Sequence, residues 1–226
     1  MLRFNFCRGG QFIADFGKNL LRKDKSFNTI CNASGQAMTE REWVKSIVPD
    51  IHAGLQKSDK KLFVSDAKRL PYASEILTYK SEKPDKQHFN SYETDILIYE
   101  QLDKDTWKPR VIIETKLESV TTHDSITYSQ KAQTHKNVHP YLRYGILIGN
   151  RENYPLPGRL FRHGQHFDFM LSWRTLQADK TELKTLIEIM LDEVKSSRTL
   201  DEIIFNSRSK GRDKFTSLHR PLRLNK

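Results

Sequence analysis

The segment from residue 90 to residue 116 (NSYETDILIYEQLDKDTWKPRVIIETK) decides the fold that we expect for this chain. Residues 90–100 and 110–116 are rich in β-branched and aromatic side chains, which is typical of strands. Residues 101–109 between them are polar and contain Asp103, Lys104 and Asp105, which predicts a turn. We therefore expect the two strands to pair as an antiparallel hairpin.

The register of this hairpin predicts which side chains meet. If the turn is symmetric about residues 104 and 105, the numbers of facing residues sum to 209, and Asp95 faces Glu114 while Glu93 faces Lys116. Facing residues have Cβ atoms about 4.5–5.5 Å apart. Side chains alternate along a strand, so Glu114 and Lys116 share one face. The hairpin is thus expected to collect three carboxylates and one amine on a single face.

This combination of charges favours a hydrolytic metal site. Neighbouring carboxylates repel each other unless a proton or a cation intervenes. A few hard oxygen ligands, with room for water and a substrate phosphate, suit Mg²⁺ better than zinc. A lysine two residues from a metal-binding glutamate can orient or deprotonate the attacking water. The alternative is a surface salt bridge between Glu93 and Lys116 beside ordinary solvated acids.

The order of the elements around these residues resembles the PD-(D/E)XK nuclease superfamily, and type II restriction endonucleases in particular. The resemblance covers residues 75–150: Asp95, an apolar strand, Glu114-Thr115-Lys116, a polar helix and the strand YGILIG. It implies a restriction-endonuclease-like α/β (α+β) core, with a central mixed β-sheet flanked by helices. The residue before Asp95 is Thr94, where the family name has proline.

The resemblance also implies roles for individual residues. Asp95 and Glu114 would ligate Mg²⁺ together with the backbone carbonyl of Thr115, and Lys116 would position or activate the water. Family members often add an acid from an upstream helix and a polar residue on the helix after the lysine. Glu75 and Gln130 are the best candidates for these two positions.

A competing match to the same motif lies upstream. Asp50, preceded by proline, and Asp66-Ala67-Lys68 fit the literal pattern more closely. However, Asp50 lies within a helical stripe, and Pro71 interrupts the segment after Lys68. We therefore prefer the downstream match.

The rest of the chain predicts one domain, residues 1–226, because it contains no repeat and no low-complexity linker. A capping box at residues 39–42 begins a helix with an apolar stripe, which Pro49 is expected to kink or restart. The other expected elements are strands at 61–66, 144–149 and 167–173, helices at 124–139 and 179–194, and a loop at 151–166.

Charge indicates an acidic partner. The net charge of +10 is concentrated in residues 1–30 and in a basic C-terminal segment, residues 208–226. Such segments attract phosphate, although solvated tails have the same composition. In the core, we expect Lys131, Arg159 and Arg162 to bind double-stranded DNA.

Several function classes are disfavoured. The sequence has no apolar run of about 18 residues and no signal peptide, so we expect no membrane segment and a cytoplasmic protein. Two cysteines, Cys7 and Cys31, give neither a disulfide framework nor a zinc pattern. His135 and His139 lack the glutamate of a metalloprotease helix, so we expect surface or DNA-facing histidines.

The sequence therefore predicts a Mg²⁺-dependent DNA endonuclease, most simply a sequence-specific type II restriction enzyme that acts as a homodimer. One alternative is a repair, recombination or phage-defence nuclease of the same fold. The other is a DNA-binding protein that has lost catalysis.

Overall fold

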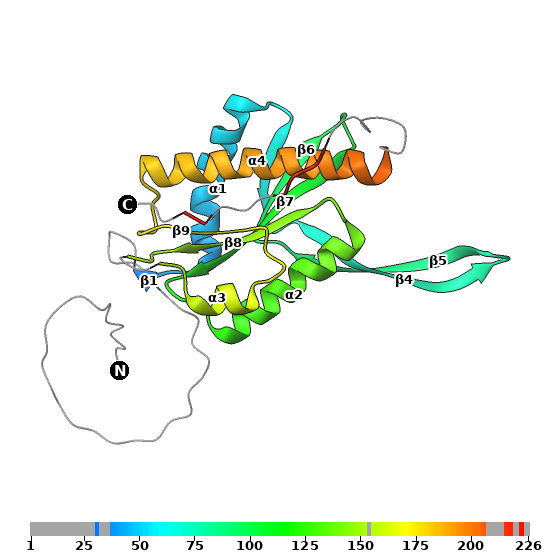
Figure 1. The fold of residues 1–226 in the computed structure, drawn as a ribbon, viewed down its shortest axis with the longest axis horizontal. Helices are drawn as coiled ribbons and strands as arrows, with labels where there is room; N and C mark the ends of the chain where they lie inside the picture. The colour runs from blue at the N-terminus through cyan, green and yellow to red at the C-terminus, as the bar shows by residue number, and fades with distance from the viewer. Residues whose placement is uncertain (1–29, 32–36, 153–154, 207–214, 219–221, 224–226) are drawn as a thin grey trace, which may run out of the picture.

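A mixed five-stranded sheet with helices on both faces forms the body of the protein in this computed structural model (Figure 1). The structure describes residues 30–31, 37–152, 155–206, 215–218 and 222–223. In chain order its elements are β1 (Ile30–Cys31), β2 (Ala37–Met38), α1 (Glu40–Ser58), β3 (Leu62–Asp66), β4 (Arg69–Lys80), β5 (Lys83–Glu93), β6 (Ile96–Gln101), β7 (Trp107–Leu117), α2 (Thr122–Val138), β8 (Arg143–Gly149), α3 (Gly158–His163), β9 (Phe169–Ser172) and α4 (Lys180–Phe205).

The strand order of the sheet is β3-β6-β7-β8-β9. The first three strands are antiparallel, whereas β7, β8 and β9 run parallel. Helix α2 makes the crossover between β7 and β8, as parallel neighbours require. All seven residues of β8 are buried, because this strand is covered on both faces. The predicted α/β class with a mixed sheet and flanking helices is confirmed.

Each face of the sheet has its own apolar core. Helices α1 and α4 cover one face, where Trp43 packs edge-on against Trp173 with ring centroids 5.9 Å apart. Helices α2 and α3 cover the other face through Ala132 and Leu160. No helix within the described residues is long and apolar enough to cross a membrane.

Most predicted elements are present. Helix α1 is continuous through Pro49, because apolar residues before and after the proline pack into the same core and offset the lost hydrogen bond. The expected loop at 151–166 contains α3, whose Leu160 is fully buried. The capping boxes at Thr39 and Asp179 are both formed. The predicted basic segments, residues 1–30 and 208–226, lie mostly outside the described residues.

The hairpin register is confirmed where it matters for the site. Ile96 pairs with Ile113 and Ile98 with Val111, so facing numbers sum to 209. A bulge after Ile98 shifts the register only on the turn side of the hairpin. The predicted strand at 90–100 is broken at its middle, and Glu93 pairs with Arg69 at the end of β5. The prediction that Glu93 faces Lys116 is therefore wrong, because β5 leaves the sheet.

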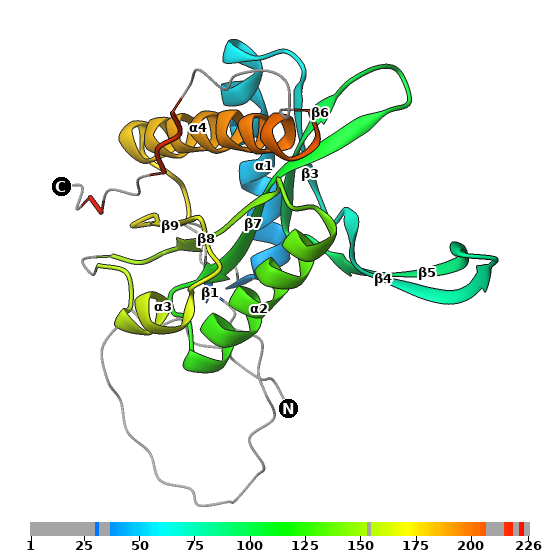
Figure 2. The ribbon, with the colours of Figure 1, turned by 45° about the vertical axis from the view of Figure 1, so that its right-hand side comes forward.

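Strands β4 and β5 form a two-stranded arm that projects from the body (Figures 1 and 2). The base of the arm packs against α2 through Tyr72 and through buried Leu70, which joins the core on that face. Beyond the base, residues 74–89 are all exposed.

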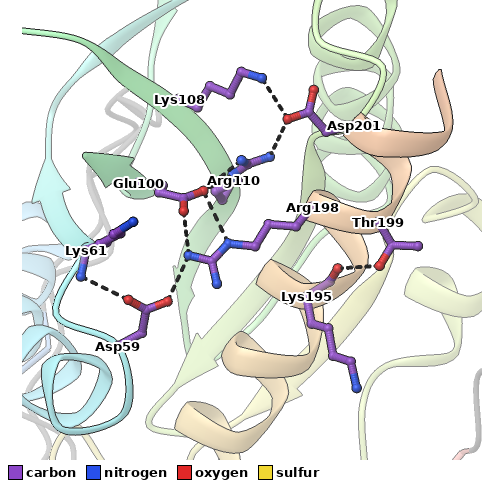
Figure 3. A network of polar contacts seen from close by, with 9 residues as sticks. All are labelled: Asp59, Lys61, Glu100, Lys108, Arg110, Lys195, Arg198, Thr199 and Asp201. Atoms are coloured by element: carbon purple, nitrogen blue, oxygen red, sulfur yellow. Dashed lines mark hydrogen bonds and ion pairs between the residues drawn. The ribbon is translucent and has the colours of Figure 1, made fainter. Parts of the chain in front are cut away.

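A network of charged side chains fastens α4 to the sheet and to the end of α1 (Figure 3). Arg110 contacts Glu100 at 2.7 Å and Asp201 at 3.1 Å. Arg198 reaches Glu100 at 2.7 Å and Asp59 at 2.8 Å. We call this network the α4 clamp; its members are Asp59, Glu100, Lys108, Arg110, Arg198 and Asp201.

Candidate active site

Asp95 is held against β7 by two hydrogen bonds. The residue lies in the short break between β5 and β6, directly before Ile96. Its Oδ2 accepts hydrogen bonds from the backbone N–H of Thr115 at 2.8 Å and from the Thr115 hydroxyl at 2.9 Å. These bonds fix the carboxylate beside the Glu114-Thr115-Lys116 segment, as the hairpin register predicted.

Glu114 is a carboxylate in an almost fully buried position, with 1% of the residue exposed. Its Oε1 accepts from the Lys131 ammonium at 3.0 Å and also from the Tyr144 hydroxyl. Burial raises the pKa of Glu114 and the nearby Asp95 raises it further, while Lys131 and Tyr144 act in the opposite direction. At Glu114, burial and the neighbouring acid therefore outweigh the two donors.

Lys116 forms an ion pair with Glu40, whose two carboxylate oxygens lie 3.0 and 3.2 Å from its Nζ. Glu40 also accepts from the backbone N–H of Leu117 at 3.4 Å. Burial acts to lower the pKa of Lys116, but interactions with Tyr128 and Glu40 outweigh burial, and the net pKa is raised. Lys116 is therefore a permanently charged ammonium in this arrangement.

Tyr128 of α2 lies between the two lysines. Its ring centroid is 5.4 Å from the Nζ of Lys116 and 5.2 Å from the Nζ of Lys131. Burial raises the pKa of Tyr128 to about 12, although Lys116 acts to lower it. The hydroxyl is thus neutral near pH 7, and the ring provides a face for both cations.

The acid from an upstream element that contacts the site is Glu40, which pairs with Lys116, and not the predicted Glu75. Glu75 lies on β4 in the exposed arm and accepts a hydrogen bond from Asn90. The segment around it was expected to be helical, but it pairs with β5 instead. Glu40 is the first residue of α1, and its position in the first turn of a capped helix was the available signal.

Helix α2 presents Lys131 to the site, and the neighbouring Gln130 is exposed. Lys131 was predicted as a DNA-binding residue, but its side chain contacts Glu114 and is 19% exposed. The polar residue expected from the helix after β7 is therefore a lysine one position later. Arg159 and Arg162 lie on α3 and are exposed, in keeping with their predicted role, which stays a prediction.

The competing upstream motif is not assembled. Asp50 is exposed on α1, and Asp66 ends β3. The Nζ of Lys68 lies 4.0 Å from the ring centroid of Tyr99 and 3.9 Å from that of Trp107, in a cation–π arrangement. Lys68 is thus engaged by aromatic rings.

His135 on α2 differs from the expectation of a surface or DNA-facing position. His135 is fully buried, with Nδ1 3.1 Å from the Pro71 carbonyl and its ring stacked on Tyr144. Burial lowers the pKa of His135 to about 4. The neutral imidazole therefore joins α2 to the base of the arm and supports Tyr144, which in turn contacts Glu114.

The candidate oxygen donors at the site are the carboxylates of Asp95 and Glu114, whose charges interact. Within the described ranges, no cluster of three or more His, Cys, Asp or Glu side chains is arranged to hold a metal ion. Two carboxylates with one carbonyl oxygen leave positions for water and phosphate, which is the coordination that Mg²⁺ favours. Asp95 and Glu114 are therefore the residues that could hold a divalent cation.

The sequence was compared with models of known protein families and with curated proteins, and neither comparison finds a match.

Proposed function

We propose that this protein is a Mg²⁺-dependent DNA endonuclease of the PD-(D/E)XK type. One observation carries the proposal: Asp95, directly before β6, is hydrogen-bonded to Thr115, which lies between Glu114 and Lys116 on β7, and the charges of Asp95 and Glu114 interact. Burial and Asp95 raise the pKa of Glu114. A buried acid with a raised pKa beside a second acid is typical of a functional site.

The metal ligands in this proposal are the carboxylates of Asp95 and Glu114 and the backbone carbonyl of Thr115. A Mg²⁺ ion bound there supplies Lewis-acid chemistry, because it polarises the scissile phosphate and lowers the pKa of a water. The hydrogen bonds from Thr115 orient Asp95 toward this position.

Lys116 has an electrostatic role in this proposal. Its raised pKa keeps the side chain as an ammonium, so it cannot remove a proton near pH 7. It can hold a water by hydrogen bonds and offset negative charge that develops on phosphate. Glu40 is a positioning residue, because it fixes the Lys116 side chain through both carboxylate oxygens.

Lys131 and Tyr144 position the carboxylate of Glu114. Both donate to Oε1 of this carboxylate, so they orient it and supply part of the positive charge that it lacks. Lys131 also adds a second ammonium beside the proposed phosphate position, and DNA binding requires positive charge there.

The substrate in this proposal is double-stranded DNA, and the protein acts as a homodimer that cuts both strands, as a type II restriction enzyme does. The exposed Arg159 and Arg162 on α3 would contact phosphates. Incubation of the full chain with plasmid and Mg²⁺ separates the alternatives. Discrete fragments favour a restriction enzyme, a smear favours a nuclease without sequence specificity, and intact plasmid favours a binding protein.

The site is tested by one substitution and a matched control. Asp95→Asn should abolish plasmid cleavage, because it removes a metal ligand while it keeps the shape of the side chain. Asp66→Asn, at the end of β3 and in the competing motif, should cleave normally. If instead Asp66→Asn is inactive and Asp95→Asn is active, the upstream motif is the site and this proposal is wrong.

A further inference from the structure

An open cavity lies between the base of the arm and helix α2 (Figure 2). Its volume is about 670 Å³, which is within the range of small-molecule sites. The arm contributes the aromatic rings of Tyr72 and Phe89, and α2 contributes Thr134, Asn137 and Val138. None of the described residues that line the cavity carries a charge. The cavity therefore suits a neutral, planar ligand rather than an ion.

Stacked rings and Lys131 join this cavity to the candidate active site. Tyr92 stacks on Tyr72, with ring centroids 3.8 Å apart. The Nζ of Lys131 lies 5.4 Å from the ring centroid of Tyr92 and 3.0 Å from Oε1 of Glu114. Thr134 follows Lys131 by three residues on α2, so the two share one face of the helix, about 4.5 Å apart along its axis. A ligand in the cavity would therefore lie beside a phosphate held at the proposed metal position.

A nucleobase has the chemistry that this cavity accommodates. Every base presents a π face, so stacking on an aromatic side chain tolerates any sequence. The Thr134 hydroxyl donates to the carbonyl of Lys131 at 2.9 Å, and its oxygen can still accept a hydrogen bond. Oδ1 of Asn137 accepts from Gln133 at 2.8 Å, which leaves the Nδ2 group of Asn137 to donate. The walls therefore offer stacking, one acceptor and one donor to a base.

We propose that this cavity, the base pocket, binds one unpaired nucleobase of the DNA strand whose phosphate lies at the candidate active site. A paired base is stacked inside the duplex, so the bound base is either already unpaired or extruded by the protein. The rings of the pocket hold the base, and the ammonium of Lys131 lies on the side of its phosphate. The substrate is thus DNA that presents an unpaired base beside the cleaved bond.

The inference rests on the proposed function, because it names the substrate of the same site. Binding of a base needs neither metal nor cleavage, so it is measured in EDTA, and plasmid cleavage with Mg²⁺ is measured separately. Base-dependent binding by a protein that cuts no plasmid would overturn the nuclease proposal alone. Plasmid cleavage without base-dependent binding would overturn the base pocket alone.

The first experiment measures binding of labelled DNA to the full chain by fluorescence anisotropy. One probe is a duplex with a single bulged nucleotide, and the other is the same duplex with an abasic bulge. The wild-type chain should bind the first probe about ten-fold more tightly, because only its bulge has a base that can stack in the pocket. Equal affinity for the two probes would overturn the proposal.

Variants of the arm locate this preference. Phe89 is 55% exposed, so Phe89→Ala should fold, and it should lose the ten-fold preference for the bulged base. Phe89→Tyr should keep the preference, because it retains an aromatic ring. The matched control is Tyr79→Ala, which removes a 64% exposed ring from the same arm outside the cavity and should behave as wild type. An unchanged preference in Phe89→Ala, or an equal loss in Tyr79→Ala, would contradict the assignment.

The second experiment locates the base and identifies its source. Iodouracil replaces the bulged base in one probe and a paired base in another, and irradiation crosslinks it to an aromatic residue that it contacts. A crosslink from the bulged probe to Tyr72 or Phe89, located by peptide mass spectrometry, supports the pocket. The same crosslink from the paired probe would show that the protein extrudes the base, and a crosslink from the bulged probe alone would show that the base arrives unpaired. Crosslinks from the bulged probe at other residues only would overturn the proposal.

Discussion

The two ends of β7 carry charged clusters with opposite electrostatic character. At one end, Arg110 belongs to the α4 clamp, where buried Glu100 contacts two arginines. Burial acts to raise the pKa of Glu100, but Arg198 and Arg110 outweigh it and the pKa is lowered. At the other end, burial and Asp95 raise the pKa of Glu114, and Lys131 does not offset them.

This difference shows how the same strand can serve stability and chemistry. Asp59 and Glu100 of the clamp have enough positive partners, so their charged form is favoured, and the clamp fastens α4 to the sheet. Glu114 of the candidate site lacks that compensation, which disfavours its charged form. The direction of the pKa shift therefore separates the two clusters.

The largest expected effect comes from replacing Lys116, near one end of β7, and Lys108, near the other end, each by alanine. Lys116→Ala should reduce single-turnover cleavage by roughly a thousand-fold, because it removes charge stabilisation at the reacting phosphate. Lys108→Ala, which breaks a 2.7 Å ion pair with Asp201 in the clamp, should cleave at the wild-type rate. Equal rates for the two variants would remove Lys116 from the catalytic centre.

The clamp should dominate stability. Arg110→Met should lower the free energy of unfolding by about 3–5 kcal/mol, since it leaves Glu100 and Asp201 buried without this partner. Lys131→Met should cost less, because Glu114 already has a raised pKa and can take up a proton. Urea unfolding at pH 7 measures both, and equal losses would contradict the contrast between the two ends.

Buried His135 differs from both glutamates, because burial keeps this titratable group neutral. Burial lowers its pKa from 6.5 to about 4, so the unfolded chain binds the proton more tightly. Stability should therefore fall as the pH drops through this window, by up to about 3 kcal/mol. In His135→Gln the fall should be shallower by that amount, whereas His123→Gln, at an exposed position on α2, should keep the wild-type slope.

The smallest expected effect is the change in stability when one buried glutamate, Glu114 or Glu100, is replaced by glutamine. A carboxyl group with a raised pKa loses its contribution to stability as the pH rises through that pKa. Glu114→Gln should therefore stabilise the metal-free protein at pH 8 by about 1 kcal/mol, and by less at pH 5. Glu100→Gln should destabilise it at pH 8, because the pKa of Glu100 is lowered. Thermal unfolding at both pH values is the measurement. A Glu114→Gln variant less stable than wild type at pH 8 would contradict the raised pKa of Glu114.

Local sequence patterns predicted much of the fold. They also singled out Asp95, Glu114 and Lys116 as candidate site residues. Alternation along β7 predicted that Glu114 and Lys116 share one face, and the turn length gave the register that pairs Ile96 with Ile113, the residues next to Asp95 and Glu114. These inferences succeed because strand period and hairpin pairing depend on neighbouring residues. Of the two outcomes predicted at Pro49, a kink or a restart, the restart is wrong, because packing along the whole helix outweighs one missing hydrogen bond.

The sequence by itself therefore determined the hairpin, the capped helices and the acid–lysine segment. Only the tertiary structure decided that Glu40 meets Lys116, 76 residues away, and that Lys131 rather than Gln130 faces Glu114. It also decided that residues 69–93 leave the sheet as an arm. Such contacts depend on how helices and strands pack across the sheet, and no local periodicity encodes which distant side chain completes a buried charge.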